Sequence, residues 1–343
     1  MSEARGAGAL GASVALLGAL VSLPALAGDE DAREWLAAMN RTVATRTYQG
    51  VYVHTGGGRT DIFRILHRYR DGHVAEHLIS LSGNGREVLR TDGEVQCFLP
   101  DERKVVVESH AEHGSLIGPM LRADASLDAS YRLELGPRVR SALGRPAREL
   151  RVVPLDDLRY GYRLQLDEET RMPLLTELCD AEGHVLEQVL FTSIKFDGTL
   201  SDALFHPTVS AEGFTWVRQP AAHPARGGAV QAWQLGQMPR GFRVSSSDIE
   251  VLPGGDGPVM HFVVSDGIAS VSVFIAAPSP PHRPVNGQGH VGTAFAFSRE
   301  VGDHEVTAVG EVPPQTLQVI ASGVAPPAPT KASVAGPALP PQR

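Results

Sequence analysis

Lysine is nearly absent from this chain of 343 residues, and cysteine occurs only twice. Three of the 31 basic residues are lysines, and the formal net charge is −8. Binding to nucleic acid requires a basic face that displaces counterions from phosphates, so this charge balance argues against a nucleic-acid partner. No Cys-x-x-Cys pair exists, which leaves the cysteines without a common metal or redox pattern.

Motifs of catalysis and cofactor binding are also missing. No G-x-S-x-G nucleophile elbow is present, and no carboxylate pair stands out as an acid/base dyad. A G-x-G-x-x-G match at Gly287–Gly292 follows a proline-rich loop and lacks the helix that a dinucleotide site needs. His73 and His77 would stand about 13 Å apart on a strand, too far for one ion. We therefore expect no catalytic residue, no metal and no cofactor.

Long hydrophobic runs are absent except at the N-terminus, where an apolar stretch extends from Leu10 to Leu26. Arg5 precedes this stretch and the small-x-small sequence Ala25–Ala27 ends it, a pattern typical of a cleaved signal peptide. The stretch is short and interrupted for a membrane span, although a retained N-terminal anchor is the alternative. We expect cleavage after Ala27 and export of the mature chain.

The chain instead contains many short β-rich segments separated by turn residues. The first block is expected to have strands at 47–55, 61–70, 74–82, 86–91, 94–99, 103–108, 130–135, 147–154, 159–167, 173–179 and 185–196. The second is expected to have strands at 230–235, 244–251, 259–265, 268–276, 293–299 and 304–310. Asp266-Gly267 predicts a two-residue hairpin turn within the second block. Helices are expected at 30–45 and 315–321, with a helical patch at 112–129.

Export would place Cys97 and Cys179 in an oxidising compartment, where a disulfide can form. Both residues lie in expected strands of the first block. Their disulfide would close a loop of about 80 residues and add about 4 kcal/mol of stability in the chain-entropy model. The alternative, which the sequence leaves equally open, is two buried thiols on strands that never meet.

Several separated motifs resemble one protein family. In the first block they are Tyr48–Gly50 (YQG), Glu87–Arg90 (EVLR), Val95–Pro100 (VQCFLP), Arg159–Asp167 (RYGYRLQLD), Met172–Leu175 (MPLL) and Leu186–Gln188 (LEQ). In the second block they are Pro239–Phe242 (PRGF), Ser265–Ile275 (SDGIASVSVFI) and Val309–Pro313 (VGEVP). From about Trp35 to about Val324 the chain is similar to the RseB/MucB family, the periplasmic regulators of the envelope-stress sigma factor.

The resemblance implies an α+β, mainly antiparallel β fold. Its N-terminal domain would be a LolA/LolB-like half-open barrel with helices and an apolar cavity, followed by a smaller β-rich C-terminal domain. We expect a signal peptide at 1–27, the half-barrel at 28–205, a linker at 206–228, the small domain at 229–323 and a disordered Pro/Ala-rich tail at 324–343. Met172 stands where the family tends to have glycine, and the tail is longer than expected.

The resemblance also implies a function and partners. A protein of this family binds the periplasmic domain of a membrane-spanning anti-sigma factor and protects it from regulated proteolysis. Lipid or lipopolysaccharide, or mislocalised lipoprotein, acts as the displacing signal. The main alternative is a periplasmic lipid or lipoprotein carrier, which would not need the second domain; an exported hydrolase would need a Ser/His/carboxylate cluster that the sequence does not display. The sequence leaves the oligomeric state open, so a homo-oligomer is possible.

Two groups of residues are candidates for binding. Apolar residues at alternate strand positions could line a lipid pocket or form ordinary core, and alternation does not reveal which face is hollow. They are Val51, Val53, Phe63, Ile65, Ile79, Leu81, Leu89 and Phe98. A crowd of arginines could dock an acidic partner segment or form a solvated face neutralised by nearby acidic residues. These are Arg138, Arg140, Arg145, Arg148 and Arg151.

Overall fold

The computed structural model describes most of the expected mature chain, namely residues 27–83, 85–91, 93–109, 127–196, 198–219, 223–224, 233–251, 257–277, 287–291 and 294–326. The expected signal peptide lies outside the described residues except for Ala27, as does the expected tail beyond residue 326. Most of the expected helical patch at 112–129 is outside them as well. Among the described helices, none combines the length and hydropathy needed to cross a membrane.

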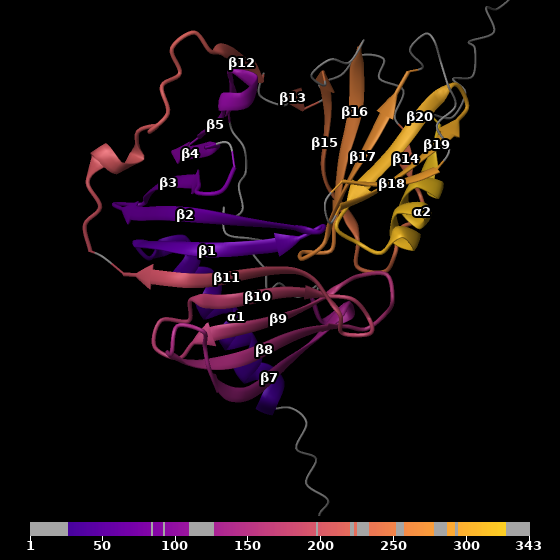
Figure 1. The fold of residues 1–343 in the computed structure, drawn as a ribbon. Helices are drawn as coiled ribbons and strands as arrows, with labels where there is room; N and C mark the ends of the chain where they lie inside the picture. The colour runs from indigo at the N-terminus through magenta and orange to yellow at the C-terminus, as the bar shows by residue number, and fades with distance from the viewer. Residues whose placement is uncertain are drawn as a thin grey trace, which may run out of the picture.

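A twelve-stranded sheet accommodates the first block (Figure 1). Its strands are β1 (Tyr48–Gly56), β2 (Arg59–Arg70), β3 (His73–Ser80), β4 (Glu87–Thr91), β5 (Glu94–Leu99), β6 (Lys104–Ser109), β7 (Tyr131–Arg140), β8 (Pro146–Pro154), β9 (Gly161–Asp167), β10 (Pro173–Cys179), β11 (Val185–Lys195) and β12 (Thr215–Gln219). Two meanders, β1–β6 and β7–β11, are joined by antiparallel pairing of β1 with β11. Among the strands that the structure describes, β12 alone pairs in parallel, with β6. A mainly antiparallel β fold is therefore confirmed.

Helix α1 (Ala27–Thr45) packs on one face of this sheet. Its apolar side chains recur at three- and four-residue spacing, so Leu36, Met39 and Val43 share one buried side of the helix. Leu36 and Met39 contact the apolar residues of β7, β8 and β9, whereas Val43 contacts the neighbourhood of β1 and β11. We call the sheet face under α1 the helix face and the opposite one the outer face.

The second block forms a seven-stranded sheet and a short two-stranded ladder (Figure 1). The strands are β13 (His223–Pro224), β14 (Gln234–Leu235), β15 (Arg243–Val251), β16 (Pro258–Ser265), β17 (Ser270–Ala276), β18 (Gly287–Val291), β19 (Ala294–Val301), β20 (His304–Gly310) and β21 (Val324–Ala325). Helix α2 (Pro314–Ser322) begins with proline, whose missing N–H costs nothing in the first turn. Leu317 and Ile320 are fully buried against the sheet.

Local sequence patterns located most of these elements within a few residues, but two expectations need comment. The hairpin between β16 and β17 is confirmed, yet its connection is the four residues Asp266–Ala269 rather than a two-residue turn. The carboxylate of Asp266 explains the longer loop, because Oδ1 accepts the backbone N–H groups of Ile268 and Ala269 at 3.0 and 2.8 Å. Cys97 and Cys179 are both free. They lie on β5 and β10, with five strands between them.

Residues 200–214 cross the outer face of the sheet and lead into β12; we call this segment the strap. The strap contains the one-turn 3-10 helix Asp202–Phe205 near its start. Elsewhere in the first domain, short 3-10 turns lie at Pro100–Glu102 and Leu127–Ala129. Val209, Ala211 and Phe214 of the strap pack against the buried cluster of β4, β5 and β6. Residues 206–219, which the sequence analysis assigned to a linker, are thus packed on or paired with the first sheet.

The pairing of β1 with β11 depends on a residue without a side chain. A Cβ added to Gly50 would lie 2.7 Å from the carbonyl oxygen of Ser193 and 2.9 Å from the ring of Phe191. We expect Gly50→Ala to lower the free energy of unfolding by about 1–3 kcal/mol, because strand backbone cannot move away without breaking the ladder. Urea unfolding measures this. Gly198→Ala is the control, because a Cβ there meets nothing within 4 Å; an equal loss in both variants would contradict the argument.

Candidate binding site

The pairing register decides which residues of the first sheet share a face. Tyr52 stands opposite Phe63, and Gly50 stands opposite Ile65. Tyr52 and Ile65 pack in one cluster with Val43 of α1, so these positions belong to the helix face. Because side chains alternate along a strand, the intervening positions of β1 and β2 point to the outer face.

The eight candidate lining residues divide between the two faces. Phe63 and Ile65 lie on the helix face, and Ile65 is fully buried. The other six follow the alternate register and lie on the outer face: Val51, Val53, Ile79, Leu81, Leu89 and Phe98. Leu89 and Phe98 are buried under the strap, whereas Leu81 is 49% exposed. One cavity could therefore be lined by only part of this set.

Polar groups hold the strap on the outer face. The Arg68 guanidinium donates to the carbonyl of Leu200 at 3.1 Å and to Asp202 at 2.6 Å. One ring nitrogen of His77 lies 2.8 Å from the carbonyl of Leu204, and the other lies 2.8 Å from Glu87. The Glu87 carboxylate also accepts the backbone N–H of Thr208 at 2.9 Å and its hydroxyl. These bonds join the strap to β2, β3 and β4.

A buried polar cluster lies on the helix face, next to the apolar residues of β1 and β2. Glu76 is 1% exposed, and its carboxylate lies 2.9 Å from Arg90 Nε and 3.7 Å from His67 Nε2. The His67 ring stacks on Tyr48 with centroids 4.7 Å apart. Burial raises the pKa of Glu76 to about 7 against the influence of Arg90, and burial lowers the pKa of His67 to about 4. The helix face thus combines apolar side chains with a carboxyl that changes charge near neutral pH.

The five candidate arginines come from β7, β8 and the turn between these strands: Arg138, Arg140, Arg145, Arg148 and Arg151. They differ in their contacts and do not form one uniform patch. Arg138 stands opposite Arg148 in the ladder. Arg140 donates to the carbonyl of Gly144 at 2.6 Å within its own turn. The Nε atom of Arg148 is buried and has no hydrogen-bond partner among the described residues.

Three of these arginines are already paired with carboxylates. Arg138 lies 2.8 Å from Glu168. Arg145 donates twice to the buried Asp167, at 2.6 and 3.1 Å. Arg151 donates at 2.6 Å to the glutamate two residues before it on the same strand. The acidic partners of Arg138 and Arg145 come from the β9–β10 side, so spacing along the sequence does not reveal how much of this positive charge is neutralised.

A pocket of about 560 Å³ opens where β8 and β10 end and β9 begins. Its size falls within the usual range of ligand sites. Of the candidate arginines only Arg151 lines it, together with Arg163. The remaining lining residues are Val152, Val153, Pro154, Leu155, Asp156, Asp157, Gly161, Tyr162, Cys179, Asp180, Ala181, Glu182 and Gly183. The pocket adjoins the second block, since the carbonyl of Asp157 accepts a hydrogen bond from Gln315 of α2 at 2.6 Å.

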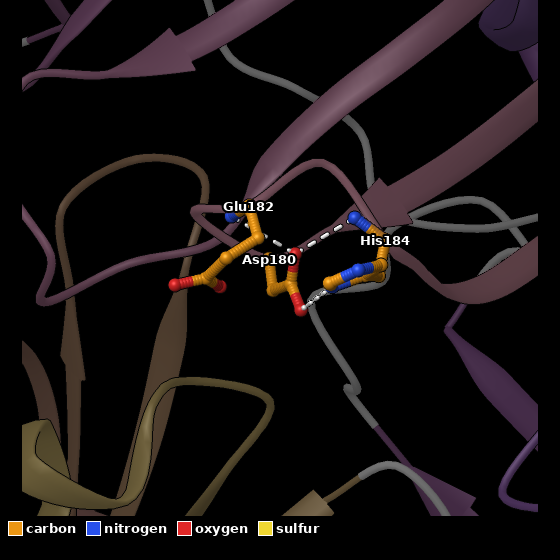
Figure 2. Close-up of side chains that lie close together, drawn as sticks. All are labelled: Asp180, Glu182 and His184. Carbon is orange, nitrogen blue, oxygen red and sulfur yellow. Dashed lines mark hydrogen bonds and ion pairs between the residues drawn. The ribbon is translucent and has the colours of Figure 1, made fainter.

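One rim of the pocket is the β10–β11 turn, where Asp180, Glu182 and His184 lie together (Figure 2). The Asp180 carboxylate accepts the backbone N–H groups of Glu182 and His184 at 3.1 and 2.8 Å, and the His184 ring at 3.0 Å. These bonds form an Asx turn, which closes a reversal of the chain with a side-chain acceptor. The grouping is therefore accounted for by turn formation.

Two family models match the chain in order. The MucB/RseB N-terminal domain matches residues 31–209, and the MucB/RseB C-terminal domain matches residues 228–325. The chain belongs to the MucB/RseB family. The first match contains strands β1 to β11 and ends within the strap, before β12, and the second contains strands β14 to β21 with α2. The resemblance inferred from the separated motifs is confirmed.

Named MucB/RseB relatives are similar over almost their whole length. The sigma factor AlgU regulatory protein MucB of Pseudomonas aeruginosa is 32% identical over 319 residues, which cover 91% of this chain and 96% of that protein. The sigma-E factor regulatory protein RseB of Escherichia coli K12 is 26% identical over 293 residues, covering 84% and 89%. In the solved complex of Pseudomonas aeruginosa MucA and MucB, the matched chain has a TM-score of 0.67 and 30% identity, covering 87% of this chain and 99% of that one. A crystal structure of MucB with MucA(peri) gives a TM-score of 0.68 and 29% identity, covering 87% and 100%.

Several residues of the helix face in this MucB/RseB chain were not among the candidates from the sequence. Tyr52 and Phe191 contact each other at a ring-centroid distance of 5.5 Å, and Leu78 packs in the same cluster. The Gly56–Gly58 turn between β1 and β2 was a usable signal, because the length of a hairpin turn fixes which residues face each other across it. Applied to Tyr52 and Phe63, that signal would have placed both on one face.

The buried Glu76 makes stability depend on pH. Its pKa is about 7 in the folded protein, against an ordinary value of 4.5 for a glutamate carboxyl. Because the pKa of Glu76 is raised by folding, the contribution of this carboxyl to the free energy of unfolding is complete below pH 4.5 and is lost as the pH rises to 7. As the pH rises from 4.5 to 7, we expect the free energy of unfolding of Glu76→Gln to increase by up to about 3 kcal/mol relative to that of the unaltered chain. His67, with its lowered pKa, changes stability in the opposite direction in both proteins, so the comparison isolates Glu76.

Urea unfolding of both proteins at several pH values between 4.5 and 8 measures this difference. Glu134→Gln is the control, because Glu134 lies on β7 with an exposed side chain beside Arg132. Parallel pH profiles for Glu76→Gln and the unaltered chain would show that the buried carboxyl does not titrate as described.

Proposed function

We propose that this protein is a periplasmic negative regulator that binds the periplasmic domain of a membrane-spanning anti-sigma factor. Binding protects the anti-sigma factor from regulated proteolysis, and lipid, lipopolysaccharide or mislocalised lipoprotein releases it. The observation that carries the proposal is membership of the MucB/RseB family in both domains and in the same order. It is supported by the relative named as a regulator of the sigma factor AlgU, and by MucB structures that contain MucA(peri). The proposal assigns no catalytic step to the chain.

The finer architecture belongs to the same proposal. Residues 28–205, with α1 and strands β1 to β11, form a LolA/LolB-like half-open barrel whose hollow is the helix face, and β12 adds one strand at its edge. Residues 229–323 form the smaller domain. Cleavage after Ala27 delivers the mature chain to the periplasm. Of the expected linker at 206–228, residues 206–219 belong to the strap and β12, and of the expected tail at 324–343, Val324 and Ala325 pair with β14 as β21.

The helix face is the proposed site for the lipid signal. Phe63 and Ile65 of the candidate set lie there with Tyr52 and the polar cluster around Glu76. On the outer face, Leu89 and Phe98 are covered by the strap, which argues against a second lipid site in that region. An acyl chain gains about 0.8 kcal/mol per buried methylene, so even a short slot would bind a lipid usefully.

The partner is proposed to contact the pocket beside the second domain, whose lining combines Arg151 and Arg163 with the acidic residues Asp156, Asp157, Asp180 and Glu182. Arg138, Arg140, Arg145 and Arg148 extend this candidate docking surface along β7 and β8. Lipid and partner need not touch the same atoms. A lipid displaces the partner only if it binds more tightly to a conformation that the partner binds less tightly.

Purified protein and the periplasmic domain of Pseudomonas aeruginosa MucA test the function directly. We expect micromolar or tighter binding by calorimetry, slower cleavage of bound MucA by a protease, and loss of both effects on adding lipopolysaccharide. A parallel pull-down from solubilised membranes of the native cell should recover a single-span protein. Recovery of lipoproteins alone would favour a carrier, and no MucA binding together with no single-span protein would contradict the proposal.

Two matched substitutions test which sheet face receives lipid. Phe63→Gln places an amide on the helix face, and Leu81→Gln places the same amide on the outer face. We expect the first to weaken binding of a fluorescent acyl-chain probe severalfold and the second to leave it nearly unchanged, because only the first makes a buried apolar slot polar. Circular dichroism checks that both variants fold. The reverse ranking would move the lipid site to the outer face.

A further inference from the structure

The two domains meet at a small, densely bonded joint. From the second domain, the joint uses the Pro239–Phe242 segment, the Asp266–Ala269 turn and the start of α2. From the first, it uses Ser130 and Tyr131 together with the connection between β8 and β9. The ribbon shows the lower ends of the second sheet reaching the β7–β10 side of the first (Figure 1).

Arg159 is the centre of this joint. Its side chain is fully buried, although arginine is among the residues least often buried without partners. Nη1 donates to Asp266 at 2.6 Å, and Nη2 donates to the carbonyl of Arg240 at 2.7 Å, both in the second domain. Nε donates to Asp156 at 2.9 Å in the first domain. One guanidinium therefore binds both domains through separate nitrogens.

The rings of Tyr131 and Phe242, one from each domain, lie near the guanidinium with centroids 5.4 and 5.1 Å from its central carbon. Arginine is suited to this position, because its planar head can stack on aromatic faces while its edge donates several hydrogen bonds. A lysine would keep the charge but lose the fork and the stacking.

Asp266 is equally buried and fully bonded. One carboxylate oxygen accepts the Arg159 guanidinium and the Tyr131 hydroxyl at 2.6 and 3.1 Å. The other accepts the two backbone N–H groups that shape its own turn. Ile268, from the same turn, is buried in the apolar cluster that α1 forms with the first sheet. The turn of the second domain therefore completes the core of the first.

Two further contacts surround this pair. The Thr316 hydroxyl and the Gln315 amide of α2 donate to the carbonyls of Leu158 and Asp157 at 2.5 and 2.6 Å. Gly241 adopts a left-handed conformation with φ +88°, and a Cβ there would overlap the Ser130 hydroxyl. The joint therefore has close contact at three points, which restricts rotation of one domain against the other.

We propose that Arg159 and Asp266 are positioning residues that hold the two domains at one angle, and that binding of the anti-sigma factor depends on that angle. The inference rests on the proposed function and adds the residues through which the two domains act as one binding unit. Removing one member of a fully buried ion pair leaves an uncompensated charge, so the docked arrangement should open when either residue is changed. Neither residue needs to touch the partner.

The experiment combines a distance measurement with a binding measurement. Spin labels are attached at Thr91→Cys and Asp303→Cys, which are exposed positions of the two domains, in a chain carrying Cys97→Ser and Cys179→Ser. The changes compared are Arg159→Met, Asp266→Asn and Gly241→Ala. Gly241→Ala disturbs the joint without removing a charge. Arg68→Met is the matched control, since its arginine is 15% exposed and ion-paired within the first domain alone.

We expect a single narrow distance distribution in the unaltered chain and the control, and a broad one in the three joint variants. Affinity for the periplasmic domain of Pseudomonas aeruginosa MucA should fall about tenfold or more in the joint variants and less than threefold in the control. The double variant Arg159→Met/Asp266→Asn should bind no more weakly than the worse single variant, because both changes break the same contact. Binding of the acyl-chain probe should be unchanged, which separates loss of positioning from loss of folding.

The outcomes distinguish this inference from the function beneath it. If the unaltered chain neither binds MucA nor recovers a single-span protein in the pull-down, the proposed function fails and the positioning role fails with it. If the unaltered chain binds and the joint variants bind as tightly as Arg68→Met, only the positioning role is overturned. Narrow distance distributions in the joint variants would overturn it as well, as would an equal loss of acyl-chain binding in Arg159→Met and Gly241→Ala.

Discussion

The architecture of the first domain depends on the pairing of β1 with β11. Without this ladder the chain would form two separate meanders, and neither would offer α1 a continuous surface. With it, Val43 of α1 can pack near β1 and β11 while Leu36 packs on β7, β8 and β9. The pairing brings together residues more than 130 positions apart, so its formation carries a large loop-closure cost that the buried helix face must offset. Gly50 is where the two strands approach too closely for any side chain.

The strands were predictable because their signals are local. Alternation of apolar and polar residues and the Gly-containing turns act over fewer than ten residues, and they located β1 to β6 closely. Features that join distant segments were not predictable. The strap lacks periodicity because His77, Glu87 and Arg68 hold it through backbone carbonyls, an N–H and short polar side chains. Likewise, β12 pairs in parallel with β6 after more than a hundred residues, which no local pattern indicates.

The candidate site was predictable only in part, for a related reason. Alternation says that Val51 and Tyr52 face opposite ways but not which of them faces α1. The lining set therefore mixed both faces, because residues were selected for being apolar rather than for their register. The arginine group was read along the chain, whereas Asp167 and Glu168, which pair with Arg145 and Arg138, approach from the end of β9. In both cases sequence neighbours stood in for three-dimensional neighbours, and the lining and docking roles of these residues stay predictions.

The RYGYRLQLD and SDGIASVSVFI motifs, which helped to indicate the MucB/RseB family, each contribute one member of the buried pair between the domains. Arg159 begins the first motif, and Asp266 is the second residue of the other. A hydrophobic joint of similar size could stabilise the contact as well, since a buried ion pair is often no more stable than apolar packing. What the ion pair adds is a requirement for correct geometry, because any slip of one domain leaves two charges without partners. For the proposed function this property is useful, because the arrangement that is proposed to bind the partner is well defined by the pair.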